Sequence, residues 1–386
     1  TYKLSQKIIR QLIRNALDET QNQLIEFLPL WIRKKYQLAD YNYSMNNIHF
    51  PESDQSYFIA RNRLVFEELF LLQMGLMSIK NQMDQKRKGI AFKSISELGE
   101  FIRSLPFELT SAQKRVVEEI KKDMISEKVM NRLVQGDVGS GKTIVAAIAL
   151  FIAVKNNYQG VMMAPTEVLA TQHYQGLAPI LNQFSIRTGL LTGSLTKKQK
   201  ENILKQIKEG EIDIVFGTHA LIQENVAFKA LGLVITDEQH RFGVRQRTIL
   251  SEKGSNPDVL VMTATPIPRT LALILYGDLD ISIIDELPPG RQKIDTYSVN
   301  SSYRHRVYQF IKKELMSGRQ AYIICPMVEE SDDQELQSVI SYTDQIKHEF
   351  EEYNISYLHG KMKPKEKQKV MEEFLKGEIH ILVSTT

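Results

Sequence analysis

Short apolar runs alternate with stretches of helical periodicity from about residue 107 onward. Runs of this length suit strands buried on both faces, and their alternation with helices is typical of a mainly parallel sheet covered by helices. The candidate strands are Leu133–Gln135, Gly160–Ala164, Ile212–Gly217, Leu231–Thr236 and Val259–Thr263. The pattern therefore predicts an α/β domain over residues 106–285.

A second, shorter series of apolar runs follows the proline-rich stretch Glu286-Leu-Pro-Pro-Gly-Arg291. Its candidate strands are residues 320–326, 355–358 and 379–384. Because proline and glycine interrupt regular elements, we predict a linker at 286–297 and a second α/β domain at 298–386.

Residues 1–105 show no clear strand pattern. Between Arg61 and Gly75, apolar residues such as Leu64, Leu69 and Leu72 recur on one wide face of a helix. We therefore expect a helical connecting segment ahead of the first α/β domain.

Composition excludes only a few classes of protein and partner. The 386 residues are 42% apolar, enough to fill real cores, and the net charge of +3 neither demands nor excludes a polyanionic partner. Cys325 is the single cysteine and is expected as a buried strand thiol, which suits a reducing cytoplasm. Five lysines between Lys361 and Lys369 indicate a solvated helix start more readily than a DNA contact. No apolar stretch approaches the roughly 18 to 20 residues of a membrane helix, so we expect no membrane association.

One segment carries a specific chemical signal. It satisfies the pattern G-x-x-x-x-G-K-[ST] between an apolar run and a helix-forming run, as the phosphate-binding P-loop requires. Glycines let successive N–H groups point at phosphate oxygens, and the helix adds its N-terminal dipole. Lys142 would neutralise the β- and γ-phosphates, and Thr143 would ligate Mg²⁺. The predicted cofactor-binding residues are Gly136, Asp137, Val138, Gly139, Ser140, Gly141, Lys142 and Thr143.

An acidic pair lies at the carboxyl end of the predicted strand Leu231–Thr236. Because α/β sheets bind ligands at this end of their strands, Asp237 is expected to hold Mg²⁺ through water and Glu238 to polarise the attacking water. Gln239 and His240 follow directly and complete the group of candidate catalytic residues. Taken alone, the pair also fits an ordinary acidic strand end or a helix cap.

Several turns that follow predicted strands offer hydroxyl groups, which bind phosphates without reading sequence. Each turn alone is also an ordinary connection between a strand and a helix. Thr263 and Thr265 would sense the state of the acidic motif. The candidate DNA contacts in this domain are Pro165, Thr166, Thr192, Gly193, Ser194, Thr218 and His219.

The order of these motifs resembles the superfamily 2 helicases, which have two RecA-like lobes. The residues within these motifs resemble those of the RecG family of bacterial branched-DNA helicases still more closely. The matching stretches are Gly136–Thr143, Asp237–Val244, Thr263–Leu271, Leu287–Arg291, Asn47–Pro51 and Arg63–Leu69. The translocase module of the transcription-repair coupling factor shares Arg-Phe-Gly-Val but differs in the acidic tetrad and in the turn at Ala164–Glu167.

The resemblance implies an ATP-dependent DNA helicase that remodels stalled replication forks and Holliday junctions in recombination and repair. It implies ATP and Mg²⁺ as cofactors, a single-stranded-DNA-binding protein as a further partner, a monomeric state and a cytoplasmic, nucleoid-associated location. It also assigns Phe107 to stacking on adenine, Gln113 to the adenine edge and Thr385 to a phosphate of the tracked strand. Thr110 or Ser111 as a helix cap is the competing explanation of the Gln113 region.

Two departures from the family bear on activity. RecG proteins begin with an oligonucleotide-binding wedge domain and carry a late arginine motif in their second lobe, whereas this sequence starts at Thr1 and stops at Thr386. The sequence is therefore expected to be an internal fragment with an incomplete second lobe. Loss of such an arginine costs on the order of 10³ to 10⁵ in turnover, so the fragment by itself should bind ATP weakly and hydrolyse almost none.

Three alternatives stay open at this point. The loop would also suit a regulatory ATPase that only switches conformation, or a nucleic-acid-binding module with a vestigial site. An RNA helicase would share the same fold, because the turns do not distinguish the sugar.

Overall fold

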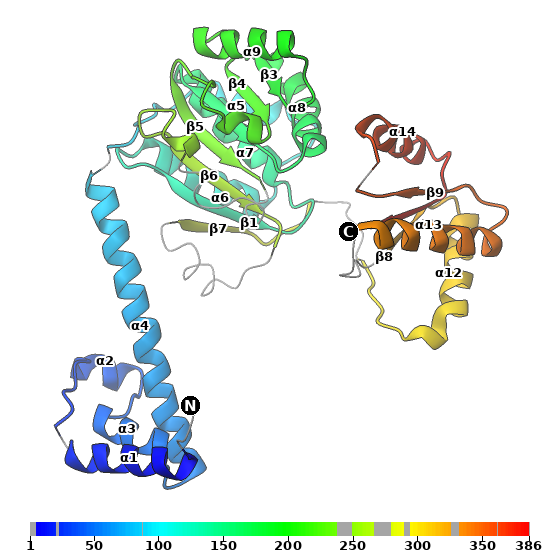
Figure 1. Ribbon diagram of the computed structural model, residues 1–386. Helices are drawn as coiled ribbons and strands as arrows, with labels where there is room; N and C mark the ends of the chain where they lie inside the picture. The colour runs from blue at the N-terminus through cyan, green and yellow to red at the C-terminus, as the bar shows by residue number, and fades with distance from the viewer. Residues whose placement is uncertain are drawn as a thin grey trace. The chain divides into compact units, whose positions relative to one another are not determined.

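The computed structural model describes residues 5–20, 23–86, 88–237, 249–265, 279–288, 294–325, 332–360 and 362–385 (Figure 1). The chain divides into two compact units, Thr1–Arg291 and Gln292–Thr386. This division falls inside the range where the sequence predicts a linker.

The first unit begins with helices α1 (Gln6–Glu19), α2 (Leu30–Lys35), α3 (Tyr41–His49) and the long α4 (Asp54–Lys86). The predicted helical stretch from Arg61 to Gly75 lies within α4. Its large apolar residues are mostly exposed, with Leu69 at 47% and Leu72 at 42%. A charged residue, Arg63, is instead the fully buried position of this stretch.

Arg63 ties α4 to the chain that precedes it. Its guanidinium donates to Glu26 Oε1 at 2.8 Å and forms an ion pair with Glu67 one turn later. The rings of Phe27 and Tyr41 flank it, each centred 5.7 Å away. Because a buried charge must be paired and hydrogen-bonded, this cluster depends on all of its members.

Replacing Arg63 with methionine should destabilise the helical segment by about 3–5 kcal/mol, because it leaves the Glu26 and Glu67 carboxylates without their buried partner. Hydrogen exchange of the amides of α3 and the first half of α4 measures this directly. The exposed Arg61, two residues earlier on α4, gives the matched control Arg61→Met, which should leave exchange unchanged. Equal exchange in the two variants would contradict the assigned role of Arg63.

A seven-stranded sheet forms the centre of the first unit, and every neighbouring pair is parallel. Its spatial order is β3-β4-β2-β5-β6-β1-β7. The strands are β1 (Asn131–Gly136), β2 (Gln159–Met163), β3 (Thr188–Leu191), β4 (Ile214–Gly217), β5 (Leu231–Thr236), β6 (Asp258–Thr263) and β7 (Asp280–Ile284). The predicted α/β class with a mainly parallel sheet is confirmed.

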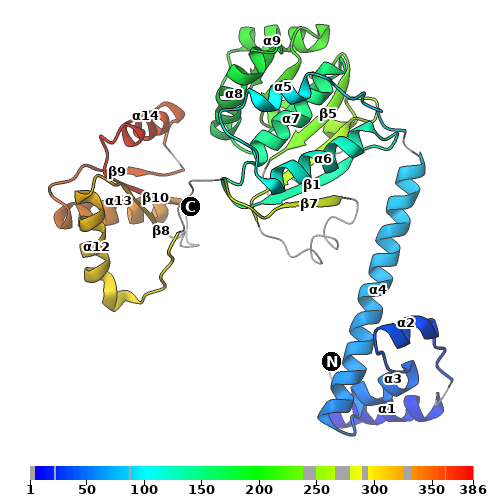
Figure 2. The same ribbon diagram turned by 180° about the vertical axis from the view of Figure 1, so that it is seen from behind.

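Apolar cores lie on both faces of this sheet, and Figures 1 and 2 show the sheet from opposite sides. Along β1, Val134 packs into one core and Leu133 into the other, as the two-residue period of a strand requires. The helices of this layer arrangement are α5 (Leu98–Arg103), α6 (Ser111–Ile125), α7 (Lys142–Lys155), α8 (Glu167–Asn182) and α9 (Lys197–Glu209). One core also includes residues ahead of 106, since Phe101 stacks on Phe151 with ring centres 4.2 Å apart.

Asp258 starts β6 in a fully buried position. Its Oδ1 accepts the Met130 N–H at 2.7 Å, while Oδ2 has no hydrogen-bond partner among the described residues. Burial, reinforced by the nearby Asp123 carboxylate, raises the pKa of Asp258 well above its ordinary value. The charged form of this side chain therefore destabilises the fold.

Replacing Asp258 with asparagine should stabilise the protein at pH 7 by on the order of 1 kcal/mol, because the amide oxygen can still accept the Met130 N–H and the buried carboxylate charge is removed. The folded pKa lies above the unfolded one, so wild-type stability falls as pH rises through the interval between them. The advantage of the variant should accordingly shrink as pH is lowered below the unfolded pKa. Thermal unfolding across pH tests this, with the exposed Glu252→Gln as control. A variant no more stable than wild type at pH 7 would contradict it.

The second unit has a three-stranded parallel sheet, ordered β8-β10-β9. Its elements are α12 (Arg304–Met316), β8 (Ala321–Cys325), α13 (Asp332–Glu349), β9 (Ile355–Leu358), α14 (Pro364–Leu375) and β10 (Ile381–Thr385). Cys325 ends β8 as predicted but is only half-buried, which is enough to raise the pKa of its thiol. The lysine-rich stretch beginning at Lys361 runs into the first turns of α14.

Candidate nucleotide and nucleic-acid site

The strand order sorts the predicted site residues into two neighbouring groups. All the strands are parallel, so their carboxyl ends share one edge of the sheet. The turns expected to contact DNA follow β3, β4 and β2, which are adjacent. The P-loop, Asp237 and Thr263 follow or end β1, β5 and β6, which are also adjacent. The boundary between the groups lies between β2 and β5.

Glycine makes the P-loop conformation possible at two positions. Gly139 and Gly141 have φ angles of 78° and 86°, in the left-handed region that other residues rarely adopt. A side chain at Gly141 would also start only 2.2 Å from the Gln113 amide nitrogen. Gly141 is the N-cap of α7, so the loop delivers the first N–H groups of that helix, which lack partners within the helix.

Lys142 is buried and folds back over the loop. Its ammonium donates to the carbonyls of Gly136 at 2.7 Å and Asp137 at 3.0 Å. The hydroxyl of Ser140 is buried beside them and has no hydrogen-bond partner among the described residues. A cation and an unsatisfied hydroxyl thus lie together in the loop, with Thr143 in the first turn of α7.

Gln113 braces this loop from α6. Its Nε2 donates to the Ser140 carbonyl at 2.8 Å, and its Oε1 accepts the Thr110 N–H at 2.9 Å. The Thr110 hydroxyl accepts the Gln113 N–H, and the two bonds together form a capping box at the start of α6. The helix-cap explanation therefore describes the geometry of this segment. An amide group has two N–H donors and two acceptor lone pairs, so these bonds leave Gln113 the capacity for a contact with adenine. Gln113 is buried, whereas Phe107 is 51% exposed.

Asp237 directly follows β5 and is held at two points. Its N–H donates to the Met163 carbonyl at 2.9 Å, and its Oδ2 accepts from His173 Nε2 at 2.8 Å. The sequence drew no attention to His173, which lies 64 residues away. The catalytic candidates Glu238, Gln239 and His240 lie outside the described residues. Within the described part of the chain, no group of three or more His, Cys, Asp or Glu side chains could hold a metal by itself.

The two coupling candidates end the neighbouring strand. Thr263 is buried, and its hydroxyl accepts the Thr265 N–H at 3.2 Å. Thr265 is exposed. This bond orders the turn after β6, beside the strands that carry the P-loop and Asp237.

The predicted DNA contacts differ in how far they are exposed to solvent. Thr166 caps α8 and is exposed, as are Gly193, Ser194 and His219, while Pro165 is half-buried. Thr192 and Thr218 are buried, and the Thr192 hydroxyl is 3.1 Å from that of Ser194. In the second unit, Thr385 ends β10 half-buried.

Glu167 joins two of these turns and was missed in the sequence. Its Oε1 accepts the Ser194 N–H at 3.0 Å, so the first residue of α8 fixes the turn after β3. In the sequence, the only indication of a role for Glu167 is that it ends the stretch Ala164–Glu167, which follows a predicted strand.

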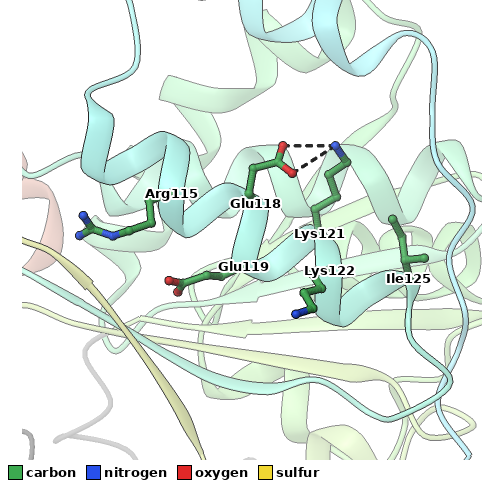
Figure 3. Close-up of a pocket in the computed structure, with 6 residues that line it drawn as sticks. All are labelled: Arg115, Glu118, Glu119, Lys121, Lys122 and Ile125. Carbon is green, nitrogen blue, oxygen red and sulfur yellow. Dashed lines mark hydrogen bonds and ion pairs between the residues drawn. The ribbon is translucent and has the colours of Figure 1, made fainter.

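The start of the predicted linker is fixed to α6. Glu286 Oε2 accepts the Ala112 N–H at 2.9 Å, and Arg115 donates to the Ile283 carbonyl and to Asp285. Farther along α6 is a hollow of about 610 Å³ (Figure 3). The residues that line it come from α6 alone, carry charges of both signs and include none of the predicted site residues: Arg115, Glu118, Glu119, Lys121, Lys122 and Ile125.

Comparison with known proteins relates the chain to helicases. Residues 110–274 match the DEAD/DEAH box helicase family, and residues 304–386 match the helicase conserved C-terminal domain. The chain is 48% identical to the ATP-dependent DNA helicase RecG of Bacillus subtilis, over 98% of this chain and 56% of that protein. It is 46% identical to the RecG of Thermotoga maritima, over 100% of this chain and 50% of that one.

A solved structure of RecG bound to a three-way DNA junction also resembles it. The TM-score is 0.76 with 43% sequence identity, covering 100% of this chain and 51% of that one. The chain thus spans about half the length of the relatives it matches. None of its described helices is long and apolar enough to cross a membrane.

Proposed function

Because the chain belongs to the RecG family of helicases, we propose that the whole protein is an ATP-dependent DNA helicase that acts on branched DNA. Stalled forks and Holliday junctions are its proposed substrates, in recombination and repair. One observation carries the proposal: a single sheet edge holds a P-loop and an acidic strand end next to three hydroxyl-bearing turns. A motor needs this adjacency, because hydrolysis must change the DNA contacts.

The nucleotide roles follow from the chemistry of each residue. Lys142 exchanges its carbonyl contacts for the β- and γ-phosphates, whose charge it neutralises. Thr143 and Asp237 would hold Mg²⁺, which would supply positive charge to the phosphates of the nucleotide. The left-handed glycines and the unsatisfied Ser140 hydroxyl support a loop that fits phosphate.

The remaining roles complete the proposed nucleotide site. Glu238 activates water, while Gln239, His240, Thr263 and Thr265 couple hydrolysis to movement. Phe107 stacks on adenine, and Gln113 binds the adenine edge with the remaining donor and acceptor positions of its amide.

DNA binding is assigned to the turns after β2, β3 and β4 and to Thr385. Exposed hydroxyls and backbone N–H groups at Thr166, Ser194 and His219 contact phosphates, and the buried Thr192 and Thr218 shape these turns. These contacts carry no base information, so selectivity for a branch must come from elsewhere in the whole protein. We also propose a cytoplasmic, nucleoid-associated monomer with a single-stranded-DNA-binding protein as a partner.

Strand displacement by the full-length protein tests this proposal. A labelled strand should be released from a three-way junction when ATP and Mg²⁺ are both present, and much more slowly from a linear duplex of the same sequence. Release that needs no nucleotide, or that is confined to RNA, would contradict it. A regulatory ATPase would hydrolyse ATP without any strand release.

A further inference from the structure

A histidine lies against the proposed metal ligand from a different element. His173 Nε2 donates to Asp237 Oδ2 at 2.8 Å, and both side chains are 11% exposed. A carboxylate offers two oxygens, so a bond to Oδ2 restricts the rotation of the group and thereby fixes the direction of Oδ1. Nothing in the roles assigned above uses His173.

The position of His173 on α8 is held firmly by packing. Ala170, Leu177 and Leu181 are buried at the spacing of a core-facing helix stripe. Tyr174 packs edge-on against Phe216 of β4, with ring centres 5.9 Å apart. Residue 173 falls on this inward stripe, where an apolar side chain would be expected. A polar side chain at such a position is retained when it has a specific partner.

The segment from the end of β2 to the second turn of α8 therefore contacts Asp237 at two points. Met163, the last residue of β2, accepts the Asp237 N–H at 2.9 Å and fixes its backbone. His173, in the second turn of the following helix, fixes its carboxylate. This connection lies at the boundary between the two groups of turns, and it also contains Thr166 and Glu167.

We propose that His173 is a positioning residue that orients the Asp237 carboxylate for the divalent cation of the bound nucleotide. The proposal rests on the proposed function, since it takes Asp237 as a ligand of that cation. His173 touches neither nucleotide nor metal. Its effect is on the affinity for the cation, as is typical of hydrogen-bond partners of metal ligands.

Matched variants separate this role from simple packing. Methionine and glutamine have nearly the same length and shape, but only glutamine keeps an N–H donor near the position of Nε2. His173→Met should therefore lose the contribution of His173 to cation affinity, and His173→Gln should retain most of that contribution. Gln172→Met, on the exposed side of α8, controls for added methionine.

The measurement is binding of a fluorescent ADP to the full-length protein as Mg²⁺ is varied. His173→Met should raise the Mg²⁺ concentration at half-saturation about 10- to 100-fold. Affinity for ADP in excess chelator should stay at the wild-type value, because Lys142 and the loop are unchanged. His173→Gln and Gln172→Met should follow the wild-type Mg²⁺ curve.

An unaltered Mg²⁺ curve for His173→Met would overturn the proposal, and so would an equal shift in His173→Gln, which would indicate packing alone. If His173→Met fails to fold, hydrogen exchange of the wild-type protein tests the proposal instead. Adding Mg²⁺ to its ADP complex should increase protection across residues 170–177, and no change there overturns the proposal. Because these measurements need no DNA, they stand apart from strand displacement, whose failure would count against the proposed function.

Discussion

Replacing Lys142 with alanine should reduce ATP hydrolysis by the full-length protein at least about 10²-fold, the usual loss on removing one group that stabilises developing charge. Lys142 is the buried cation of the loop, and its ammonium already contacts the Gly136 and Asp137 carbonyls that line it. Alanine leaves the glycine geometry intact but removes the positive charge. Unwinding should be lost with hydrolysis, because the motor then has no source of energy.

DNA binding should survive this change, since the proposed contacts follow other strands. Affinity for a forked DNA should stay within a few-fold of wild type, measured at one fixed salt concentration. Lys208→Ala, which removes an exposed lysine from α9, should leave both hydrolysis and unwinding unchanged. Full unwinding by Lys142→Ala would instead favour a binding module in which the loop is vestigial.

Replacing Gly141 with alanine should weaken nucleotide binding by distorting the loop rather than by removing a charge. The φ of 86° costs an L-residue about 1–2 kcal/mol. The new methyl would also lie 2.2 Å from the Gln113 amide nitrogen, which is buried and bonded to the Ser140 carbonyl. Either the Gln113 side chain or the start of α7 must therefore shift, and we expect a loss in ADP affinity of at least about tenfold from these terms together, since about 1.4 kcal/mol corresponds to tenfold in an equilibrium constant.

Gly176 gives the matched control in the same unit. It lies on the exposed side of α8, where an added methyl would meet nothing within 4 Å. Gly176→Ala should keep ADP affinity and raise stability by roughly 0.5–1 kcal/mol, because alanine loses less backbone freedom in a helix. Equal ADP affinity in Gly141→Ala and wild type would show that the loop does not depend on the left-handed residue.

The parts of the site that could be predicted from sequence are those encoded locally. Gly136 to Thr143 follow one strand and open one helix, so spacing and residue type are sufficient to identify the loop. The strands β1, β2, β4, β5 and β6 could be read because they are buried on both faces, and their apolar runs are therefore continuous. Strand β7 was missed because it is an edge strand with a partly exposed, irregular pattern.

The rest depends on contacts between residues far apart in the chain. His173 meets Asp237 across 64 residues, and Arg63 meets Glu26 across 37. Neither partner carries a local signal, and Arg63 even occupies a buried position on a helix whose leucines are largely exposed. Gln113 is intermediate, since its capping box with Thr110 was foreseen as the alternative, but its bond to Ser140 required the folded loop.

We expect the sheet edge that carries the P-loop and the hydroxyl-bearing turns to couple nucleotide hydrolysis to the binding of branched DNA. The most direct measurement is the ATP hydrolysis rate of the full-length protein, titrated in parallel with a three-way DNA junction, a linear DNA duplex and RNA. We expect strong stimulation by the junction, weaker stimulation by the linear duplex and little by RNA. A rate that is the same with and without every nucleic acid would contradict it.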